Sequence, residues 1–501
     1  MKKHISVVDI NDRTMTDQRI ADGLSVVSAD EAASLIPDEA TLFSGGVGAG
    51  PKELPIALAH GDRDLSLSIV SSADAGFLTD TQLVASDGVD FRYPFAVWPD
   101  HQKAANAGEL SFVDGHLSSI GRTIQQNVFS PEFGFDGPTV AVVEAAAVEN
   151  DRFVPTTAIG AVPTFVDHAD RVIVEVNEAV PLAVGEFHDV YRPGTPPRES
   201  IPISDPGDRV GDRYVELPQE PDAVVRSEQP PMPYPFRDLT ADEGMIADAT
   251  VAFLEREVER NPAFEDRLTM EVGVGTLGNE IMRRLDTLAA SGYDLAYYGE
   301  VIQDGLLELI ADGALEAASG TGIVISQEWI DRVYDEPEVF TDALCIRPVD
   351  VSNEPSVIRR LGLVGVNSAV EVDVYGNANS SYVRGSRVLQ GIGGSGDFAR
   401  NALVSVIVLP STAKDGSASR IVPMATHVDH PNHDVDVVVT EQGVADLRGL
   451  APVERAERLI EACAHPDFRD DLYAYLERAS AGDEPGHIPH DLETAFDPLE
   501  P

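Results

Sequence analysis

Hydrophobic and polar positions alternate along the chain in a way that predicts strands and helices in turn. Residues 40–50 (ATLFSGGVGAG) begin as an apolar run and end in a glycine turn, and residues 51–60 begin with Pro51 and continue as a helix. Short apolar runs at 65–73, 139–148 and 171–180 predict further strands. This alternation is typical of an α/β domain with a mostly parallel sheet.

The pattern changes at residues 192–236, which are dense in proline and polar residues and predict a long connection between domains. Residues 239–260 follow as a strong amphipathic helix with a capping-box-like start. A second α/β series comes next, and its later strands are expected at three stretches: 370–376, 402–411 and 435–443.

We therefore predict an α/β fold of two tandem open domains of similar design, with mostly parallel sheets and the active site between them. The N-terminal domain is expected to span residues 1–225 and the C-terminal domain residues 226–480, followed by a loose acidic tail, 481–501. A length of 501 residues suits at least two domains, and a hydrophobic content of 43% is enough to fill their cores.

The net charge of the chain indicates the salt concentration at which the protein works and excludes some classes of binding partner. The formal net charge is −49, from 36 Lys and Arg against 85 Asp and Glu. Periodic apolar segments along the whole chain exclude a disordered acidic protein, so the charge indicates a halophilic globular protein, in which molar salt screens self-repulsion. It also makes nucleic acid and anionic membranes improbable partners, because those require a basic surface.

Two cysteines, Cys345 and Cys463, lie far apart in the sequence and form neither a disulfide framework nor a zinc motif. The first residues lack a long apolar segment of the secretory type, and no run approaches the roughly 20 apolar residues that span a bilayer. We expect a cytoplasmic protein.

Residues 273–278 (GVGTLG) fit the dinucleotide-binding pattern G-x-G-x-x-G between a strand and a helix. Glu300 lies about 20 residues further on, where such a site keeps its ribose-binding acid. Glycine-rich turns between strand and helix occur in many α/β folds, however, because glycine allows tight turns and close approach of the backbone. Glu300 therefore has three interpretations at this point: a surface residue, a ribose ligand or a nucleophile.

A second glycine-rich loop, LQGIGGSGDFARNA at 389–402, has four glycines within six residues before a predicted helix. Its backbone N–H groups would suit an oxyanion hole or an anion nest, and a plain tight turn is the alternative. A third loop, 44–55, precedes a helix and would hold a phosphate or form a structural turn, but it lacks the GK[ST] of a P-loop.

Three histidines, His427, His430 and His433, lie near Asp429 on an irregular segment, but their spacing matches no familiar zinc pattern, and we predict no metal site. Glu441 directly follows a buried strand, and ligands of open α/β sheets bind at strand ends.

Taken together, these stretches resemble the acetyl-CoA hydrolase/transferase family, within the class I CoA-transferases and similar to succinyl-CoA:acetate CoA-transferases. The resemblance runs over roughly residues 35–480 and rests on the order and spacing of several motifs: RYPFAVWPDHQKAANAGELSFVDGHLS (92–118), VIVEVNEAVP (172–181), GVGTLGNEI (273–281), GEVIQDG (299–305), VSNEP (351–355), VEVDVYGNANS (370–380), GIGGSGDFARNA (391–402) and HVDHPNHDVDVVVTEQGVADLRGL (427–450).

The resemblance implies a role for several residues. Glu300 would form a covalent glutamyl-CoA thioester, Asn353 would steady its carboxylate, and Gly394 would give a backbone N–H to an oxyanion. The substrate-binding residues that it implies are Glu441, Arg209, Gly275, Gly393 and Gly396, and of these Arg209 aligns least securely. One departure is Gly299, where the family usually has threonine or a similar residue; glycine there is expected to loosen the backbone beside the nucleophile.

The implied activity is acyl-CoA:carboxylate CoA transfer between short-chain acids such as acetate, propionate and succinate, with coenzyme A as substrate and no other cofactor. Hydrolysis of acetyl-CoA on the same site is one alternative, and an NAD-dependent oxidoreductase that uses the 273–278 loop is another. A sensor that binds CoA esters without turnover is a third. The expected partners are an acyl-CoA and a short-chain carboxylate, and we expect a homodimer from the frequency of closed symmetry.

Overall fold

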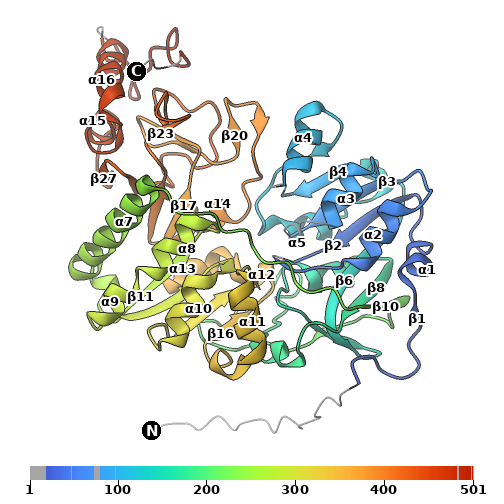
Figure 1. Ribbon diagram of the computed structural model, residues 1–501. Helices are drawn as coiled ribbons and strands as arrows, with labels where there is room; N and C mark the ends of the chain where they lie inside the picture. The colour runs from blue at the N-terminus through green and yellow to red at the C-terminus, as the bar shows by residue number, and fades with distance from the viewer. Residues whose placement is uncertain are drawn as a thin grey trace.

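The computed structural model describes residues 18–46, 48–72, 79–95, 98–481, 484–497 and 499. Two α/β halves lie side by side (Figure 1), the N-terminal half in blue to green and the C-terminal half in green to red. Val47, in the predicted 44–55 loop, and residues 482–483, 498 and 500–501 of the expected tail lie outside the described residues.

The N-terminal sheet has the strand order β1-β10-β8-β6-β2-β3-β4-β5, and all of these neighbours are parallel. The strands are β1 (Val26–Val27), β2 (Glu39–Ser44), β3 (Ser66–Ser71), β4 (Val89–Pro94), β5 (Ser111–Phe112), β6 (Thr139–Val148), β8 (Arg171–Asn177) and β10 (Ala223–Ser227), with β7 (Arg152–Pro155) and β9 (Val215–Glu216) as an antiparallel extension. The helices are α1 (Ala29–Ala33), α2 (Glu53–His60), α3 (Thr79–Ala85), α4 (Pro99–Ala107), α5 (Ser119–Gln125) and α6 (Val162–His168), with short 3₁₀ turns at Pro131–Phe133 and Leu182–Phe187.

The C-terminal sheet has the order β16-β14-β12-β11-β17-β22-β26-β27 and is parallel except at its edge strand β27. Its strands are β11 (Arg267–Val272), β12 (Asp294–Tyr298), β14 (Ala317–Gly320), β16 (Leu344–Ile346), β17 (Val364–Ser368), β22 (Val404–Val408), β26 (Val437–Thr440) and β27 (Gly443–Asp446). The helices around it are α7 (Ala241–Arg260), α8 (Thr276–Arg283), α9 (Asp286–Ala290), α10 (Asp304–Ala311), α11 (Gln327–Asp335), α12 (Val349–Ser352), α13 (Pro355–Leu361) and α14 (Ser395–Asn401).

Short strand pairs and the last two helices complete the C-terminal half. The pairs are β13 (Val301–Ile302) with β15 (Gly322–Ile323), β18 (Glu371–Asp373) with β19 (Ala378–Asn379) and β25 (Ile421–Val422), β20 (Tyr382–Val383) with β21 (Arg387–Val388), and β23 (Thr412–Ala413) with β24 (Ala418–Ser419). Helices α15 (Pro452–Cys463) and α16 (Pro466–Ala479) stand at the upper left of Figure 1, and 3₁₀ turns lie at Pro262–Phe264 and Pro337–Val339.

The two predicted sheets and their parallel strands are confirmed, and local sequence explains much of them. The side chain of Thr240 accepts a hydrogen bond from the N–H of Glu243, and the Glu243 carboxylate accepts one from the N–H of Thr240, so α7 begins with the expected capping box. The strand β22 is buried along its whole length because helices cover both faces of a parallel sheet.

The boundary between the halves differs slightly from the expected one. Strand β10 continues to Ser227, so the predicted boundary at 225 cuts a strand of the N-terminal sheet. After it, the chain crosses to the C-terminal half, and the N–H of Tyr234 donates to the carbonyl of Ile325 at 2.8 Å. Proline and polar residues suit this crossing because it makes few ladder hydrogen bonds.

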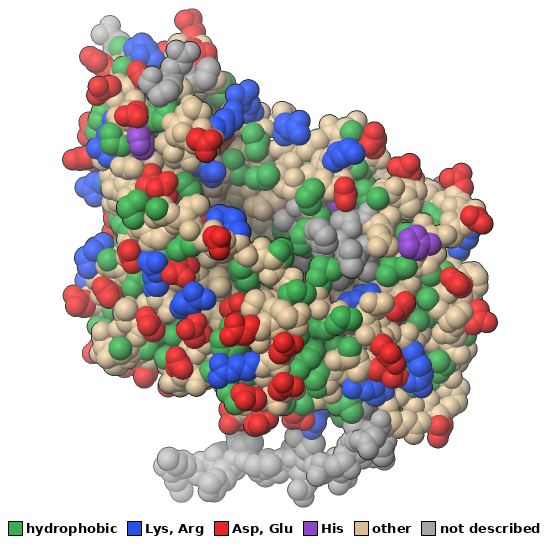
Figure 2. Space-filling model, in the orientation of Figure 1, with side chains coloured by type: hydrophobic (Ala, Val, Ile, Leu, Met, Phe, Trp, Pro, Cys, Tyr) green, Lys and Arg blue, Asp and Glu red, His purple; other side chains and the backbone are tan. Residues whose placement is uncertain are grey.

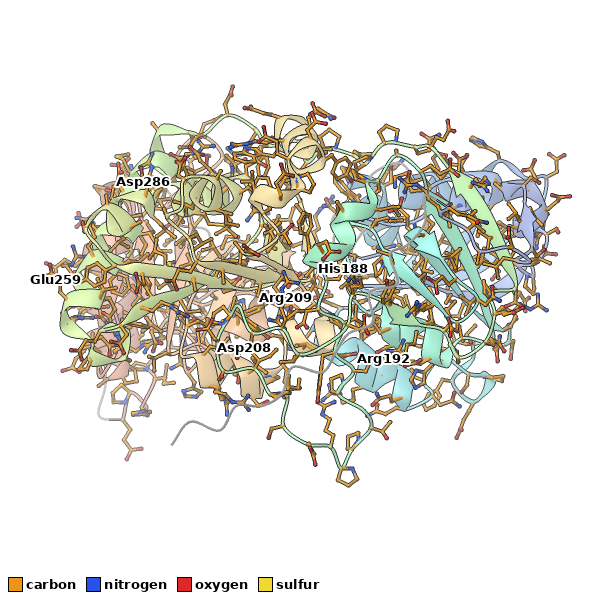
Figure 3. The ribbon with its side chains drawn as sticks, turned by 90° about the horizontal axis from the view of Figure 1, so that it is seen from below. His188, Arg192, Asp208, Arg209, Glu259 and Asp286 are labelled. Carbon is orange, nitrogen blue, oxygen red and sulfur yellow. The ribbon has the colours of Figure 1, made fainter. Side chains whose placement is uncertain are left out.

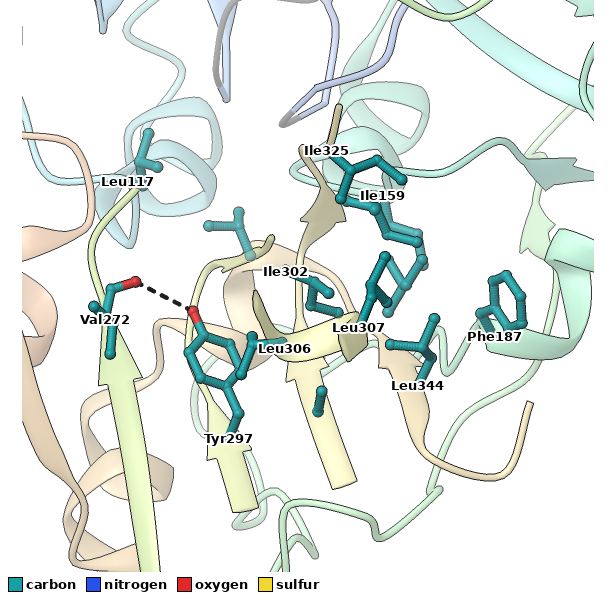
Figure 4. Packing of buried hydrophobic residues seen from close by; sticks show 14 of the residues in the cluster. Leu117, Ile159, Phe187, Val272, Tyr297, Ile302, Leu306, Leu307, Ile325 and Leu344 are labelled. Carbon is teal, nitrogen blue, oxygen red and sulfur yellow. Dashed lines mark hydrogen bonds between the residues drawn. The ribbon is translucent and has the colours of Figure 1, made fainter. Parts of the chain in front are cut away.

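The halves share a hydrophobic core. Figure 4 shows Ile159 and Phe187 of the N-terminal half close to Leu307 and Leu344 of the C-terminal half, and all four belong to one buried cluster. A fully buried ion pair between Arg347 and Asp189 also joins the halves. Breaking such a pair would leave a buried charge without a partner, so the relative position of the two sheets is strongly specified.

The expectation of a loose tail is wrong for the described part of residues 481–501. Ala495 is buried, the hydroxyl of Tyr375 donates to the carbonyl of Pro489, and the Tyr475 hydroxyl lies 2.8 Å from Nδ1 of His490. These contacts join segments that are distant in the sequence, so the acidic composition of the tail did not predict them. Among the described residues, no helix is long and apolar enough to cross a membrane.

Candidate functional site

Glu300 follows β12 at the carboxyl edge of the C-terminal sheet. Its backbone carbonyl accepts hydrogen bonds from the N–H of Thr321 at 2.7 Å and from Oγ1 of Thr321 at 3.1 Å, which fixes the backbone at this position. The side chain is half-buried, and its Oε2 lies 3.5 Å from Nδ2 of Asn353. Ligands bind at this edge in open α/β sheets, so the carboxylate has the place expected of a functional group.

The second glycine-rich loop brings its backbone directly onto this carboxylate. A Cβ atom on Gly394 would lie 1.7 Å from Oε2 of Glu300 and 2.6 Å from Nδ2 of Asn353. The backbone of Gly394 has an ordinary helical conformation, so close approach is what requires glycine here. The structure therefore brings together three of the residues selected from the sequence: Glu300, Asn353 and Gly394.

Two neighbouring positions of this loop, 393 and 396, are glycine for other structural reasons. Gly393 has a φ of 60°, in the left-handed region, and its carbonyl accepts from the N–H of Leu117 at 3.1 Å. A Cβ on Gly396 would lie 2.3 Å from Cε1 of His116. Both glycines fasten the loop to the N-terminal half, and neither has a described contact with the Glu300 carboxylate.

The surroundings of Glu300 change its protonation. Burial and then the negative charge of Asp397 raise the pKa of Glu300 from 4.5 to about 7, while the hydrogen bond from Asn353 opposes them. Burial also raises the pKa of Glu271 well above its ordinary value, and the charge of Glu300 adds to that effect. Perturbed carboxyl groups of this kind are typical of active sites.

Gly299, the departure from the family pattern, follows β12 directly and packs against Tyr297 of that strand. A Cβ on residue 299 would lie 2.3 Å from the hydroxyl oxygen of Tyr297, which itself donates to the carbonyl of Val301 at 2.8 Å. Figure 4 shows the same hydroxyl directed at the carbonyl of Val272. The glycine therefore makes room for a buried tyrosine, and the backbone beside Glu300 is held by that tyrosine.

A cavity of about 820 Å³ opens at the carboxyl edge of the same sheet, beyond the ends of β11, β17 and β22, and Glu300 is not among the residues that line it. Figure 2 shows Lys and Arg side chains on the rim of a hollow near β20 and β23. The basic residues of the cavity are Arg237, Lys414 and Arg420, with His465 nearby, and the GVGTLG turn forms another part of its wall. The lining also includes four acidic residues, Asp242, Glu243, Asp415 and Glu441, so the cavity is mixed in charge.

Two predicted substrate-binding residues line this cavity. Gly275 caps the start of α8, and its N–H donates to Oε1 of Gln303 at 2.9 Å. Burial alone would raise the pKa of Glu441, but hydrogen bonds from Ser411 and Gln442 outweigh it and lower the pKa. The N–H of Ser411 donates to the Glu441 carboxylate at 2.8 Å. This hydrogen bond fixes the Glu441 side chain at the carboxyl end of β26.

Arg420, which the sequence analysis did not select, faces Glu441 across the cavity. Its Nε is buried and, within the described part of the chain, has no hydrogen-bond partner. Burial lowers the pKa of Arg420, and the charges of Glu243 and Glu441 oppose that effect. No sequence motif marks Arg420, since only the β23–β24 hairpin brings it over the sheet.

Arg209 lies neither against the Glu300 carboxylate nor in the lining of the 820 Å³ cavity. Its guanidinium donates to the backbone carbonyls of Glu186 at 3.0 Å, His188 at 3.2 Å and Thr341 at 2.8 Å, and also to that of Leu344. Figure 3 shows it where the two halves meet, near His188. Those carbonyls occupy most of its donors, so the structure gives Arg209 a role in joining the halves, and Arg209 is not among the residues that line the 820 Å³ cavity.

In the two remaining candidate segments, the 44–55 loop and the histidine segment 427–433, other groups of the protein make the available contacts. The carboxylate of Glu175 accepts from the N–H groups of Lys52 at 2.8 Å, Glu53 at 3.1 Å and Leu54 at 3.2 Å, so it occupies the helix N-terminus where a phosphate was one option. His427 lies 3.0 Å from Asp429, and buried His430 lies 3.3 Å from Oγ of Ser380. No cluster suited to a metal ion occurs among the described residues.

Comparison with known proteins shows the family to which the chain belongs. Residues 17–225 match the acetyl-CoA hydrolase/transferase N-terminal domain, and residues 330–476 match the C-terminal domain of the same family. The chain therefore belongs to the acetyl-CoA hydrolase/transferase family, as the resemblance of its motifs indicated.

Curated relatives cover nearly the whole chain. Succinyl-CoA:acetate CoA-transferase of Clostridium kluyveri is 39% identical over 94% of this chain and 88% of its own. Propanoyl-CoA:succinate CoA transferase of Escherichia coli is 38% identical over 94% and 96%, and acetyl-CoA hydrolase of Yarrowia lipolytica is 36% identical over 92% and 91%. None of these relatives supports the oxidoreductase alternative.

Solved structures show the same fold. RipA from Yersinia pestis has a TM-score of 0.69 with 23% identity, and the match covers 91% of this chain and 97% of that one. At this identity the likeness concerns the fold alone, and it confirms the predicted architecture of two α/β domains.

Proposed function

We propose that the protein is an acyl-CoA:carboxylate CoA-transferase that moves coenzyme A between short-chain acids through a thioester on Glu300. The observation that carries the proposal is the placement of the Glu300 carboxylate against Gly394 and Asn353, at the edge of the sheet on which the cavity also opens. A carboxylate is a weak nucleophile in water, but a desolvated and directed carboxylate attacks a thioester.

The reaction needs only the substrates and this carboxylate. Glu300 attacks the acyl carbonyl carbon, the C–S bond breaks, and a mixed anhydride and CoA thiolate form. The thiolate attacks the glutamyl carbonyl, the C–O bond breaks, and the donor acid leaves as its carboxylate. An acceptor carboxylate then repeats both steps in reverse and regenerates Glu300. Each tetrahedral oxyanion needs fixed donors, which the Asn353 amide and the glycine-rich loop would supply. We propose no further cofactor.

The cavity has the chemistry that coenzyme A requires. Lys414 lies at the tip of the β23–β24 hairpin without a partner among the described residues, and the Nε of Arg420 is unpaired below it. Both are free to meet phosphate groups. The apolar part of the wall suits the pantetheine arm and is formed by Val272, Leu277, Val366, Val408 and Leu409.

Hydrolysis of acetyl-CoA is the second candidate, because the curated relatives include acetyl-CoA hydrolases. The two activities differ in whether water or a carboxylate reaches the glutamyl thioester. We also propose a cytoplasmic homodimer adapted to high salt. The two buried, unpaired cysteines fit a reducing compartment, and the net charge of −49 fits high ionic strength.

The test incubates the protein in molar KCl with acetyl-CoA, with and without succinate or propionate, and follows free thiol and new CoA ester. New ester that requires the acceptor, with little free thiol, is the expected result. Free thiol without regard to the acceptor would indicate a hydrolase, and neither product from any short acyl-CoA would exclude both.

The variant Glu300→Gln tests the nucleophile. It should lose nearly all turnover and fail to gain the mass of CoA on the peptide that carries residue 300, while its melting temperature stays close to that of the wild type. Glu308→Gln is the matched control, because Glu308 lies on the surface of the next helix, α10. Retention of most activity in Glu300→Gln would show that the nucleophile is another residue.

A further inference from the structure

A series of hydrogen bonds leads away from Glu300 to a second carboxylate. Asp397, in the first turn of α14, is buried and accepts from Nδ2 of Asn353 at 3.1 Å. It also accepts from the N–H of Ser118 at 3.1 Å and from Oγ of Ser118 at 2.5 Å. The Asn353 amide thus stands between two carboxylates and donates to both of them.

The amide of Asn353 has nothing else to orient it. Asn353 is fully buried, and its Oδ1 has no hydrogen-bond partner within the described ranges. Its bond to Glu300 is long, at 3.5 Å, whereas its bond to Asp397 is of ordinary length. If the amide turned over, Oδ1 would face two carboxylates, so the Asp397 contact decides which atom of Asn353 meets Glu300.

We propose that Asp397 is a positioning residue of the reaction, which acts through Asn353 and keeps its Nδ2 directed at Glu300 in every state of the cycle. The inference rests on the proposed function of Glu300.

The reaction explains why this support is needed. Glu300 attracts an amide N–H strongly only while it is ionised, and it is neutral as an anhydride or a thioester. An oxyanion then forms on the Glu300 carbonyl at each attack. If the Asn353 amide has turned away by then, it must turn back to donate, which raises the activation barrier. Asp397 takes no part in the bond changes, and its contacts with Asn353 and Ser118 hold the donor in place while the charge of Glu300 disappears.

The groups that surround Glu300 and Asp397 fit a reacting role for Glu300 and a positioning role for Asp397. Glu300 faces Asp397 from α14, Glu271 from β11 and Tyr297 from β12, while Asp397 faces Ser118 and His116. Burial raises the pKa of Asp397, but Ser118 and Asn353 donate to it and stabilise its anion. Glu300 has the Asn353 donor alone among described side chains, so hydrogen bonds stabilise the anion of Asp397 more than that of Glu300.

The series also joins the two halves of the protein. Ser118 precedes α5 in the N-terminal half, whereas Asp397, Asn353 and Glu300 belong to the C-terminal half. The orientation of Asn353 therefore depends on contact between the halves.

A kinetic double-mutant cycle tests the proposal. Asp397→Asn keeps the size of the side chain and should lower kcat about 10- to 100-fold with little change in the KM for acyl-CoA. Asn353→Ala should cause a loss of similar size. If Asp397 acts through Asn353, the double variant should be no more than a few-fold slower than Asn353→Ala. Losses that multiply would overturn the proposal.

The pH profile gives an independent readout. Loss of the Asp397 charge should move the acidic limb of kcat/KM to lower pH, because that charge raises the pKa of Glu300. Asp373→Asn is the control: Asp373 is also buried and hydrogen-bonded, but it lies in β18, and its variant should lower the melting temperature without moving the limb. An unmoved limb in Asp397→Asn would also contradict the proposal.

Ser118→Ala serves if Asp397→Asn fails to fold. It removes one donor to Asp397 and should lower kcat several-fold in the wild type but not in Asn353→Ala. Equal losses in both backgrounds would overturn the proposal. Failure of the proposed function would appear differently, as a wild type without CoA transfer or hydrolysis, or as an active Glu300→Gln.

Discussion

A Cβ atom on residue 394 would lie 1.7 Å from Oε2 of Glu300, so the absence of a side chain at Gly394 is what gives that carboxylate its position. The backbone conformation of residue 394 would accept any amino acid. The constraint is therefore one of space at the site, and it leads to the first of several predictions.

Gly394→Ala should displace the Glu300 carboxylate and lower kcat roughly 100-fold, since misplacement of a reacting group by about 1 Å has that order of effect. Steady-state kinetics and the rate of thioester formation measure this. Gly244→Ala in α7 is a matched control, because the nearest atom to its Cβ would be 3.7 Å away, and it should leave kcat unchanged. A Gly394→Ala enzyme with wild-type kcat would show that Glu300 does not need its observed position.

The activity should depend on pH through Glu300. Its pKa of about 7 means that the nucleophilic anion forms as the pH rises through neutrality, so kcat/KM should rise about tenfold per pH unit below 6 and level off above 8. A limb with its midpoint near the ordinary carboxyl value would contradict the burial of this group.

Whereas kcat/KM should rise with pH, the contribution of Glu300 to the free energy of unfolding should fall as the pH rises. A raised pKa means that the folded state holds the proton more tightly than the unfolded chain, so this contribution is fully present below the ordinary value of 4.5 and is lost as the pH approaches about 7. Glu300→Gln should make denaturant-derived stability fall less steeply than in the wild type over that range. Equal slopes in the two proteins would show that Glu300 titrates normally.

Gly299→Thr, which restores the usual residue of the family, should destabilise this protein by roughly 1–3 kcal/mol, because the new Cβ would overlap the Tyr297 hydroxyl. Tyr297→Leu removes the overlapping atoms. In the double variant the two changes should cost less than the sum of the single changes, as measured by denaturant unfolding. Additive costs would show that the two side chains do not compete for space.

Arg209 and Arg420 should behave differently when each is replaced by methionine. Arg209→Met leaves backbone carbonyls without their donor and should cost roughly 1–2 kcal/mol of stability with the KM values unchanged. Arg420→Met should raise the KM for acyl-CoA and leave the melting temperature nearly constant. A raised KM for the acceptor acid in Arg209→Met would return that residue to the substrate site.

Salt should stabilise the protein. The Debye length falls from about 10 Å to about 3 Å between 0.1 M and 1 M salt, which screens the repulsion among charges that sum to −49. The melting temperature should rise by several degrees over that range in KCl. A constant or falling melting temperature would contradict adaptation to high salt.

The sequence by itself determined the larger part of the architecture. Apolar runs such as 139–148 and 402–411 specify buried parallel strands, because both faces of such strands must be covered, and the capping residues Thr240 and Glu243 mark the start of α7. These signals are local and need no knowledge of the partner segment. The order of the motifs also selected Glu300, Asn353 and Gly394, which the fold brings together.

Only the tertiary structure decided what depends on distant segments. The start of α2 was expected as an anion site or a turn, and it is occupied by Glu175 from another strand; Arg209 was expected at the substrate, and it bonds carbonyls of both halves. Asp397 gains its place between Ser118 and Asn353 only because the two halves meet there. Such roles follow from which surfaces pack together, and residue spacing along the chain does not contain that information.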